Sequence, residues 1–286
     1  CLVNIKEERI FFSGGQDLCV WSEKGELLDK MQRNSEDSDI NTLLPLKNNR
    51  IVAASNKFSL VIYSVMRITD DSQNLKIVEV KKLSPHRESI RCLIRVADSM
   101  FASASLDGAI VLWSSQRLSF MRQFNFVKDY EGQYHTYPAS AQHIFTVDQK
   151  YILASIGHGF FLYDTMSGNC LAKVTNAHHG KIIHSVLLCK GYLLATCSED
   201  GSVRIWGSPN PLLVCDGSTS QSFNLQVERF LGRSISEVQN IKSPITPALL
   251  GECLAHTGAI NMALNLGEEG FAFLWKRWPC CFVEGQ

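Results

Sequence analysis

The stretch "CSEDGSVRIW", residues 197–206, combines an Asp-Gly pair with an apolar run that ends in tryptophan. The stretch "ASLDGAIVLW", residues 104–113, repeats the same order of residue types. Asp-Gly favours a tight hairpin turn because glycine tolerates positive φ. A catalytic group is needed once in a chain, whereas a structural corner recurs in every repeat. The two stretches therefore predict repeated β-hairpins.

Short apolar runs that end in an aromatic residue recur along the whole chain. Each follows another apolar strand and a polar turn, with almost no helical periodicity, so we predict an all-β fold. In the last unit "HTGAINMALNLGEEG" passes directly to "FAFLW", so a middle strand is expected to be missing. The final aromatics are Trp21, Tyr63, Trp113, Tyr163, Trp206 and Trp275, with spacings of 42, 50, 50, 43 and 69 residues. The first four spacings approach the roughly 40–45 residues of a repeating four-stranded unit.

Three units are preceded by a histidine with isoleucine four residues later, in "HRESI" (86–90), "HHGKI" (178–182) and "HTGAI" (256–260). In two units the histidine is followed by a hydroxyl, an aspartate and a tryptophan. These series are His86, Ser103, Asp107 and Trp113, and His178, Thr196, Asp200 and Trp206.

This series resembles the WD-repeat family of β-propellers, and the resemblance covers nearly the whole chain. It implies a buried hydrogen-bond relay in which aspartate, histidine, hydroxyl and indole N–H supply each other's partners. We therefore expect a β-propeller over residues 1–286 with about five to six blades. The resemblance also implies an eight-bladed ring. Because the chain begins "CLVNIKEERIFFSGG" without an initiator methionine, we expect a fragment that lacks the first blades.

Residues 208–247 form an insertion between two repeats. Pro, Ser and Gly lie at both ends, and apolar residues recur at roughly helical spacing in the centre. Two interpretations stay open: a loop with scattered apolar residues, or a segment that orders on a partner. The second interpretation assigns partner binding to Phe223, Phe230, Leu231, Gly232 and Arg233.

Several phrases narrow the resemblance to one branch of the WD-repeat family: "FFSGGQDLCVW", "LKIVEVKKL", "CSEDGSVRIW" and the insertion before "LLGECLAHTGAI". The branch implies a non-catalytic, cytoplasmic scaffold subunit of a complex with two DENN-domain proteins. That complex regulates small GTPases and autophagy and is recruited to the lysosomal surface when amino acids are scarce. Recruitment in the branch uses a loop that contacts a lysosomal cationic amino-acid transporter. The alternative is a generic WD-repeat adaptor, such as a ubiquitin-ligase substrate receptor or a trafficking scaffold.

Charge and residue spacing argue against several other classes. Lys+Arg and Asp+Glu are equal at 28 each, which argues against a strong binder of nucleic acid or anionic membranes. No stretch approaches the roughly 18 apolar residues of a membrane span, so we expect no direct membrane insertion. The ten cysteines form no CxxC pair, and His178, His179 and His184 lack metal-ligand spacing. We expect no metal and no cofactor.

An enzyme is also disfavoured. A Ser-His-Asp hydrolase site needs its nucleophile, base and oxyanion hole once. Here the set recurs with a tryptophan added, and the sequence has no Gly-x-Ser-x-Gly elbow. We therefore predict that the relay residues are structural.

Overall fold

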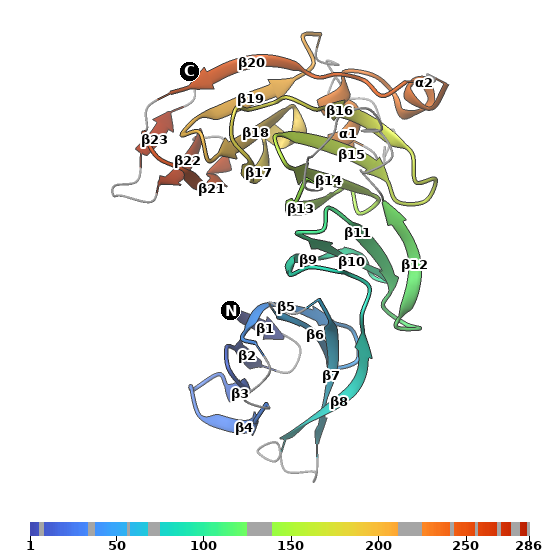
Figure 1. Ribbon diagram of the computed structural model, residues 1–286, viewed down its shortest axis with the longest axis vertical. Coiled ribbons are helices and arrows are strands. Elements are labelled where there is room, and N and C mark those ends of the chain that lie inside the picture. Colours follow the sequence, from blue (N-terminus) through green and yellow to red (C-terminus); the bar gives the residue numbers. More distant parts are fainter. Residues whose placement is uncertain are drawn as a thin grey trace. The chain divides into compact units, whose positions relative to one another are not determined.

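The computed structural model describes residues 1–5, 9–33, 38–55, 58–67, 75–124, 139–210, 225–240, 243–254, 257–267, 270–275 and 281–284 (Figure 1). The chain forms two compact units, Cys1–Ser140 and Ala141–Gln286. Each unit consists of antiparallel sheets whose strands pair in chain order.

The first unit contains three four-stranded sheets. In each sheet the second and third strands are the most buried, because apolar side chains point to both faces. The strands of the first sheet are β1 (Leu2–Ile5), β2 (Ile10–Gly14), β3 (Leu18–Ser22) and β4 (Leu27–Met31); those of the second are β5 (Ile40–Leu46), β6 (Arg50–Ser55), β7 (Leu60–Arg67) and β8 (Leu75–Leu83); those of the third are β9 (Ile90–Ala97), β10 (Met100–Ser105), β11 (Ile110–Ser114) and β12 (Ser119–Phe124).

The second unit contains two four-stranded sheets and one sheet of three described strands. Along the chain, two short helices, α1 (Leu225–Leu231) and α2 (Ile235–Asn240), come between the last two strands of its middle sheet. Its strands are β13 (Ala141–Val147), β14 (Tyr151–Ile156), β15 (Gly159–Asp164) and β16 (Cys170–Val174); β17 (Ile182–Leu188), β18 (Leu193–Ser198), β19 (Val203–Gly207) and β20 (Ala248–Cys253); and β21 (Ile260–Asn265), β22 (Gly270–Trp275) and β23 (Cys281–Glu284). A 3-10 turn, η2 (Cys189–Gly191), joins β17 to β18.

These six sheets confirm the prediction of an all-β chain with about five to six repeating units. The last sheet is the exception that the sequence indicated. "FAFLW" belongs to β22, which pairs directly with β21, so the described part of this sheet has one strand fewer than the others.

The two Asp-Gly stretches form the turns between the second and third strands of their sheets. Gly108 and Gly201 have φ of 80° and 84°, a conformation that glycine adopts without strain. The preceding aspartate side chains accept hydrogen bonds from the backbone N–H two residues on, at 2.8 Å for Ala109 and 2.9 Å for Ser202. Both corners therefore place an aspartate carboxylate at the end of a hairpin, next to the incoming histidine.

The first strand of each sheet of the second unit has a register shift close to its start. It falls between Ala141 and His143 in β13, between Ile182 and His184 in β17, and between Ile260 and Met262 in β21. Such a bulge redirects the residue that follows it. His143, His184 and Met262 consequently occupy equivalent positions on three consecutive sheets.

Candidate functional site

The first predicted series forms a buried contact chain in the third sheet. His86 Nε2 lies 2.8 Å from Ser103 Oγ, and the Trp113 indole N–H donates to the same hydroxyl at 3.0 Å. Asp107 lies further away, with Oδ2 at 3.4 Å from His86 Nδ1. Within the described residues, His86 Nδ1 is a buried nitrogen without a well-formed hydrogen bond. This relay has hydrogen bonds from Trp113 to Ser103 and between Ser103 and His86, but not between His86 and Asp107.

Asp107 is nevertheless held as a carboxylate. Burial alone would raise its pKa, but the neighbouring His86 ring and two backbone amides outweigh burial and lower the pKa to about 2. The amides are those of Arg87 and Ala109, each 2.8 Å from a carboxylate oxygen. The aspartate therefore stabilises the hairpin corner through backbone donors as well as through the histidine.

The second series, in the β17–β20 sheet, is linked at every step. The Trp206 indole N–H donates to Thr196 Oγ1 at 2.9 Å, and His178 Nε2 lies 2.7 Å from that hydroxyl. Ser202 joins the other ring nitrogen to the carboxylate. Its Oγ lies 2.8 Å from His178 Nδ1 and donates to Asp200 Oδ1 at 2.6 Å. The direct His178–Asp200 separation is 3.5 Å.

The order of protons in this relay follows from its ends. Because the Ser202 hydroxyl donates to Asp200, it accepts from His178 Nδ1–H. Burial lowers the pKa of His178 to about 4, although the Asp200 carboxylate favours the charged form, so the ring is neutral at pH 7. A neutral ring protonated at Nδ1 accepts at Nε2, and the Thr196 hydroxyl is the donor, because this contact of 2.7 Å is shorter than its 3.3 Å contact with the Arg204 carbonyl. Each group thus donates to the next from the indole to the carboxylate.

This geometry favours a structural role for both series. Ser103 and Thr196 have no exposed surface, and each hydroxyl already has an indole donor, so a substrate cannot reach either oxygen. Over the residues that the structure describes, no group of three or more His, Cys, Asp or Glu side chains could hold a metal ion. Nor is any helix there long and apolar enough to cross a membrane.

The two helices of the insertion pack onto the second unit. The backbone N–H groups of Gln226 and Val227, at the start of α1, donate to the Asp148 carboxylate at 3.2 and 2.9 Å. Asp148 lies in the turn between β13 and β14, so it caps the helix from a distant part of the chain. On the other side, an added Cβ at Gly191 would lie 2.8 Å from Gln226 Cβ. The helix therefore fits closely between two strand turns.

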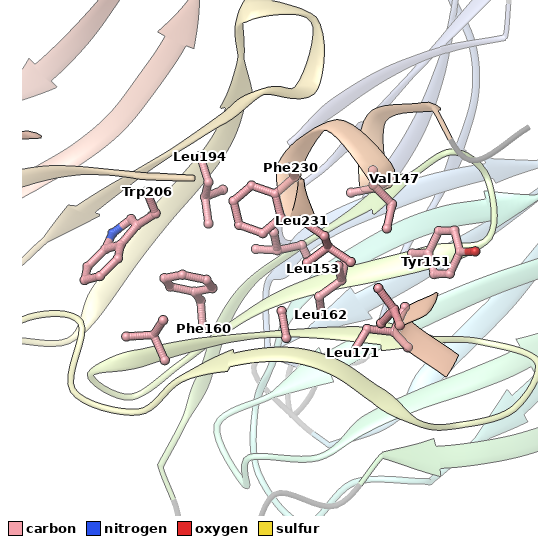
Figure 2. Close-up of a cluster of buried hydrophobic side chains, with 14 of the residues drawn as sticks. Val147, Tyr151, Leu153, Phe160, Leu162, Leu171, Leu194, Trp206, Phe230 and Leu231 are labelled. Carbon is pink, nitrogen blue, oxygen red and sulfur yellow. The ribbon is translucent and has the colours of Figure 1, made fainter. Parts of the chain in front are cut away.

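The apolar side of the two helices completes the core of this unit. Phe230 lies against Phe160, with ring centroids 6.5 Å apart, and Phe160 in turn contacts Trp206 at 5.4 Å (Figure 2). Phe230 and Leu231 are only 2% and 3% exposed. Beyond α2, Ile245 adds a short parallel bridge to β16 at Ala172. The described part of the insertion, residues 225–240 and 243–247, thus packs against two adjacent sheets.

The predicted partner-binding residues therefore fall into different environments. Phe230 and Leu231 fill the core, so binding through their side chains stays a prediction that requires α1 to leave this position. Gly232 has φ of 64°, and an added Cβ would meet Ser208 Oγ at 2.1 Å, so it is needed for the turn between the helices. Arg233 is exposed. Phe223 and the third predicted histidine, His256, lie outside the described residues.

Sequence reasoning missed Ser202 and Asp148. Ser202 had a usable signal, because it is a hydroxyl two residues after the relay aspartate, the position at which an Asx turn brings the backbone back to the carboxylate. Asp148 had no usable sequence signal, because its partner at the start of α1, Gln226, is 78 residues away.

Six repeated antiparallel sheets, with Asp-Gly corners and buried Trp–hydroxyl–His contacts in two of them, define a WD-repeat β-propeller. The β-propeller model of the WDR41 family matches residues 1–273. The chain therefore belongs to the WDR41 β-propeller family.

Curated relatives agree with this assignment. The chain is 28% identical to WD repeat-containing protein 41 of Homo sapiens and 25% identical to that of Mus musculus. Each alignment covers 96% of this chain and 64% of the relative, so the chain spans less than two thirds of their length. A chain in the crystal structure of the mitotic checkpoint complex matches with a TM-score of 0.62 and 10% identity, over 94% of this chain and 70% of that one. That likeness shows the fold alone.

Proposed function

We propose that the protein is a non-catalytic scaffold subunit of a complex with two DENN-domain proteins. In this proposal the complex regulates small GTPases and autophagy, and the scaffold helps bring it to lysosomes in response to amino-acid availability. Membership of the WDR41 family supports the scaffold class. The single observation that carries the recruiting role is the docked two-helix insertion between β19 and β20.

The insertion suits a recruiting element because its two sides differ. Its apolar side is buried in the unit, which fixes the helices on a rigid support. Its outer side presents Arg233 next to the Gly232 turn. Within the proposal, this outer side contacts a lysosomal transporter of cationic amino acids.

The test is affinity capture of the protein from cell lysate, read by mass spectrometry. Deleting the whole insertion would expose the core around Phe160 and Trp206, so a charge reversal at the exposed position, Arg233→Glu, is the better variant. Arg117→Glu, an exposed arginine in the first unit, is the matched control.

We expect DENN-domain proteins with wild type and with both variants. Transporter capture should fall by about tenfold with Arg233→Glu alone, since one charged contact contributes on the order of 1–2 kcal/mol. Capture of ubiquitin-ligase or coat subunits without any DENN-domain protein would overturn the proposal in favour of a generic adaptor. Equal transporter capture by both variants would remove this side of the insertion from the recruiting role.

A further inference from the structure

Two histidine rings lie against each other at equivalent positions on adjacent sheets of the second unit. His143 follows the bulge in β13, and His184 follows the bulge in β17. Their ring centroids are 4.2 Å apart and the ring planes differ by 33°. Neither residue belongs to a relay, so the pair is a separate feature of the first strands.

The pair also contributes hydrogen bonds between three consecutive sheets. His143 Nδ1 lies 3.3 Å from Ser185 Oγ of β17, which lies 2.9 Å from Ser155 Oγ of β14. The backbone N–H of Ala263, in β21, donates to His184 Nδ1 at 3.3 Å. This last bond requires His184 Nδ1 to be unprotonated, because a protonated nitrogen has no lone pair to accept it.

No strand around the pair supplies a counter-ion. β13, β14, β17, β18 and β21 contain no Asp, Glu, Lys or Arg. Their other titratable side chains are Cys197, opposite His184, and Tyr151, at the far end of β14. Burial raises the pKa of the Cys197 thiol to about 12, so it is neutral. The turn η2, which also contacts β17, carries Lys190 at the far end of that strand.

We propose that His143 and His184 form a proton-sensitive contact that couples these three sheets when both rings are neutral and loosens when either ring is protonated. Two neighbouring imidazoles tolerate each other as neutral rings, whereas an imidazolium would lie against its neighbour without a carboxylate. Protonation of His184 would also break the bond from Ala263. Acidification would thus weaken the β13–β17 and β17–β21 contacts first.

The direction of the pKa changes agrees with this geometry. Burial, with the neighbouring His184 ring as a second cause, lowers the pKa of His143 to about 3, and burial lowers the pKa of His184. When the contact opens, the two rings separate and regain the ordinary pKa of 6.5. As pH falls, the open form therefore takes up protons before the paired form does. The coupling is therefore complete above about pH 6.5 and is lost progressively toward pH 3. If only the titration of His143 is counted, the fraction of molecules with the two rings separated should rise about thirtyfold between about pH 7.5 and about pH 5.

The test is amide hydrogen exchange of the full chain at about pH 7.5 and about pH 5, corrected for the intrinsic exchange rate at each pH. We expect the Ala263 amide, whose N–H donates to His184 Nδ1, to lose protection on acidification. In the double variant His143→Asn and His184→Asn, the side-chain oxygens can occupy the Nδ1 positions but do not titrate, so this loss should disappear. The exposed His179→Asn is the matched control and should behave as wild type.

Equal loss of protection in wild type and in the double Asn variant would overturn the proposal. If the double variant does not fold, NMR titration of the wild-type imidazole signals decides the question. A pKa near 6.5 for both rings in the folded protein would show that the pair costs nothing to protonate and would equally refute the coupling.

Discussion

The relay in the third sheet and the relay in the β17–β20 sheet share four residue types but differ beside the aspartate. Ser202 links His178 to Asp200, whereas the equivalent residue in the other relay is Ala109. The direct histidine–aspartate separations are alike, 3.4 Å for His86 and 3.5 Å for His178, but His86 Nδ1 has no bridging hydroxyl beside it. The four-residue series is therefore not by itself a closed chain of hydrogen bonds. A fifth residue, two positions after the aspartate, decides whether the chain closes.

The largest effect is expected from Thr196→Val, which keeps the shape of the side chain and removes the central hydroxyl. The Trp206 N–H and His178 Nε2 would both lose a buried partner, at about 1–3 kcal/mol for each group. We expect the free energy of unfolding to fall by about 2–6 kcal/mol, measured by urea denaturation. Thr175→Val, at an exposed position, should change it by less than about 0.5 kcal/mol. Similar values for the two variants would contradict a relay through Thr196.

Ser202→Ala should make the His178 relay resemble the His86 relay, in which Ala109 occupies the equivalent position. His178 Nδ1 would lose its 2.8 Å partner and Asp200 a 2.6 Å donor. We expect a loss of about 1–3 kcal/mol in the free energy of unfolding, by the same measurement. An unchanged stability would mean that water replaces Ser202 at no cost.

The acid limb of the stability curve should distinguish the relay aspartates from ordinary carboxylates. The pKa of Asp107 is lowered to about 2 and that of Asp200 is lowered further. Both carboxylates therefore stabilise the folded protein at pH values above 3.8, the ordinary pKa of an aspartate. That contribution is lost as pH falls through the folded-state pKa. Because solvent screens this half-buried carboxylate, wild type should exceed Asp107→Asn in the free energy of unfolding by only about 1 kcal/mol at neutral pH, and the difference should vanish near pH 2, as followed by circular dichroism. A difference independent of pH would indicate that charge is not involved.

The smallest expected effect is a gain. Ala109→Ser should install the missing hydroxyl between His86 and Asp107, because the Ala109 backbone N–H already bonds Asp107 at 2.8 Å as Ser202 N–H bonds Asp200. We expect stability to rise by about 0.5–1 kcal/mol in urea denaturation. A loss would show that the pocket at Ala109, which is 9% exposed, cannot hold the extra oxygen.

Local sequence patterns predicted the repeated hairpins and the residues of the two relays, because corner, strand and aromatic recur at regular spacing. The helical spacing around Phe230 was also visible in the sequence. Its burial was not, because Phe230 contacts Phe160 from another sheet. The contact between His143 and His184 was likewise not visible in the sequence, because it depends on two equivalent bulges in neighbouring strands. Contacts across sheets depend on how repeats stack, and a single-sequence pattern does not contain that register.

The most direct measurement is the ¹⁵N chemical shift of the two His178 ring nitrogens at neutral pH. The relay requires a neutral ring that carries the proton on Nδ1 and accepts at Nε2, with Nδ1–H donating to Ser202 and Nε2 accepting from Thr196. The ring should therefore show a protonated Nδ1 and an unprotonated Nε2. A proton on His178 Nε2, or a doubly protonated ring, would contradict a continuous relay from Trp206 to Asp200.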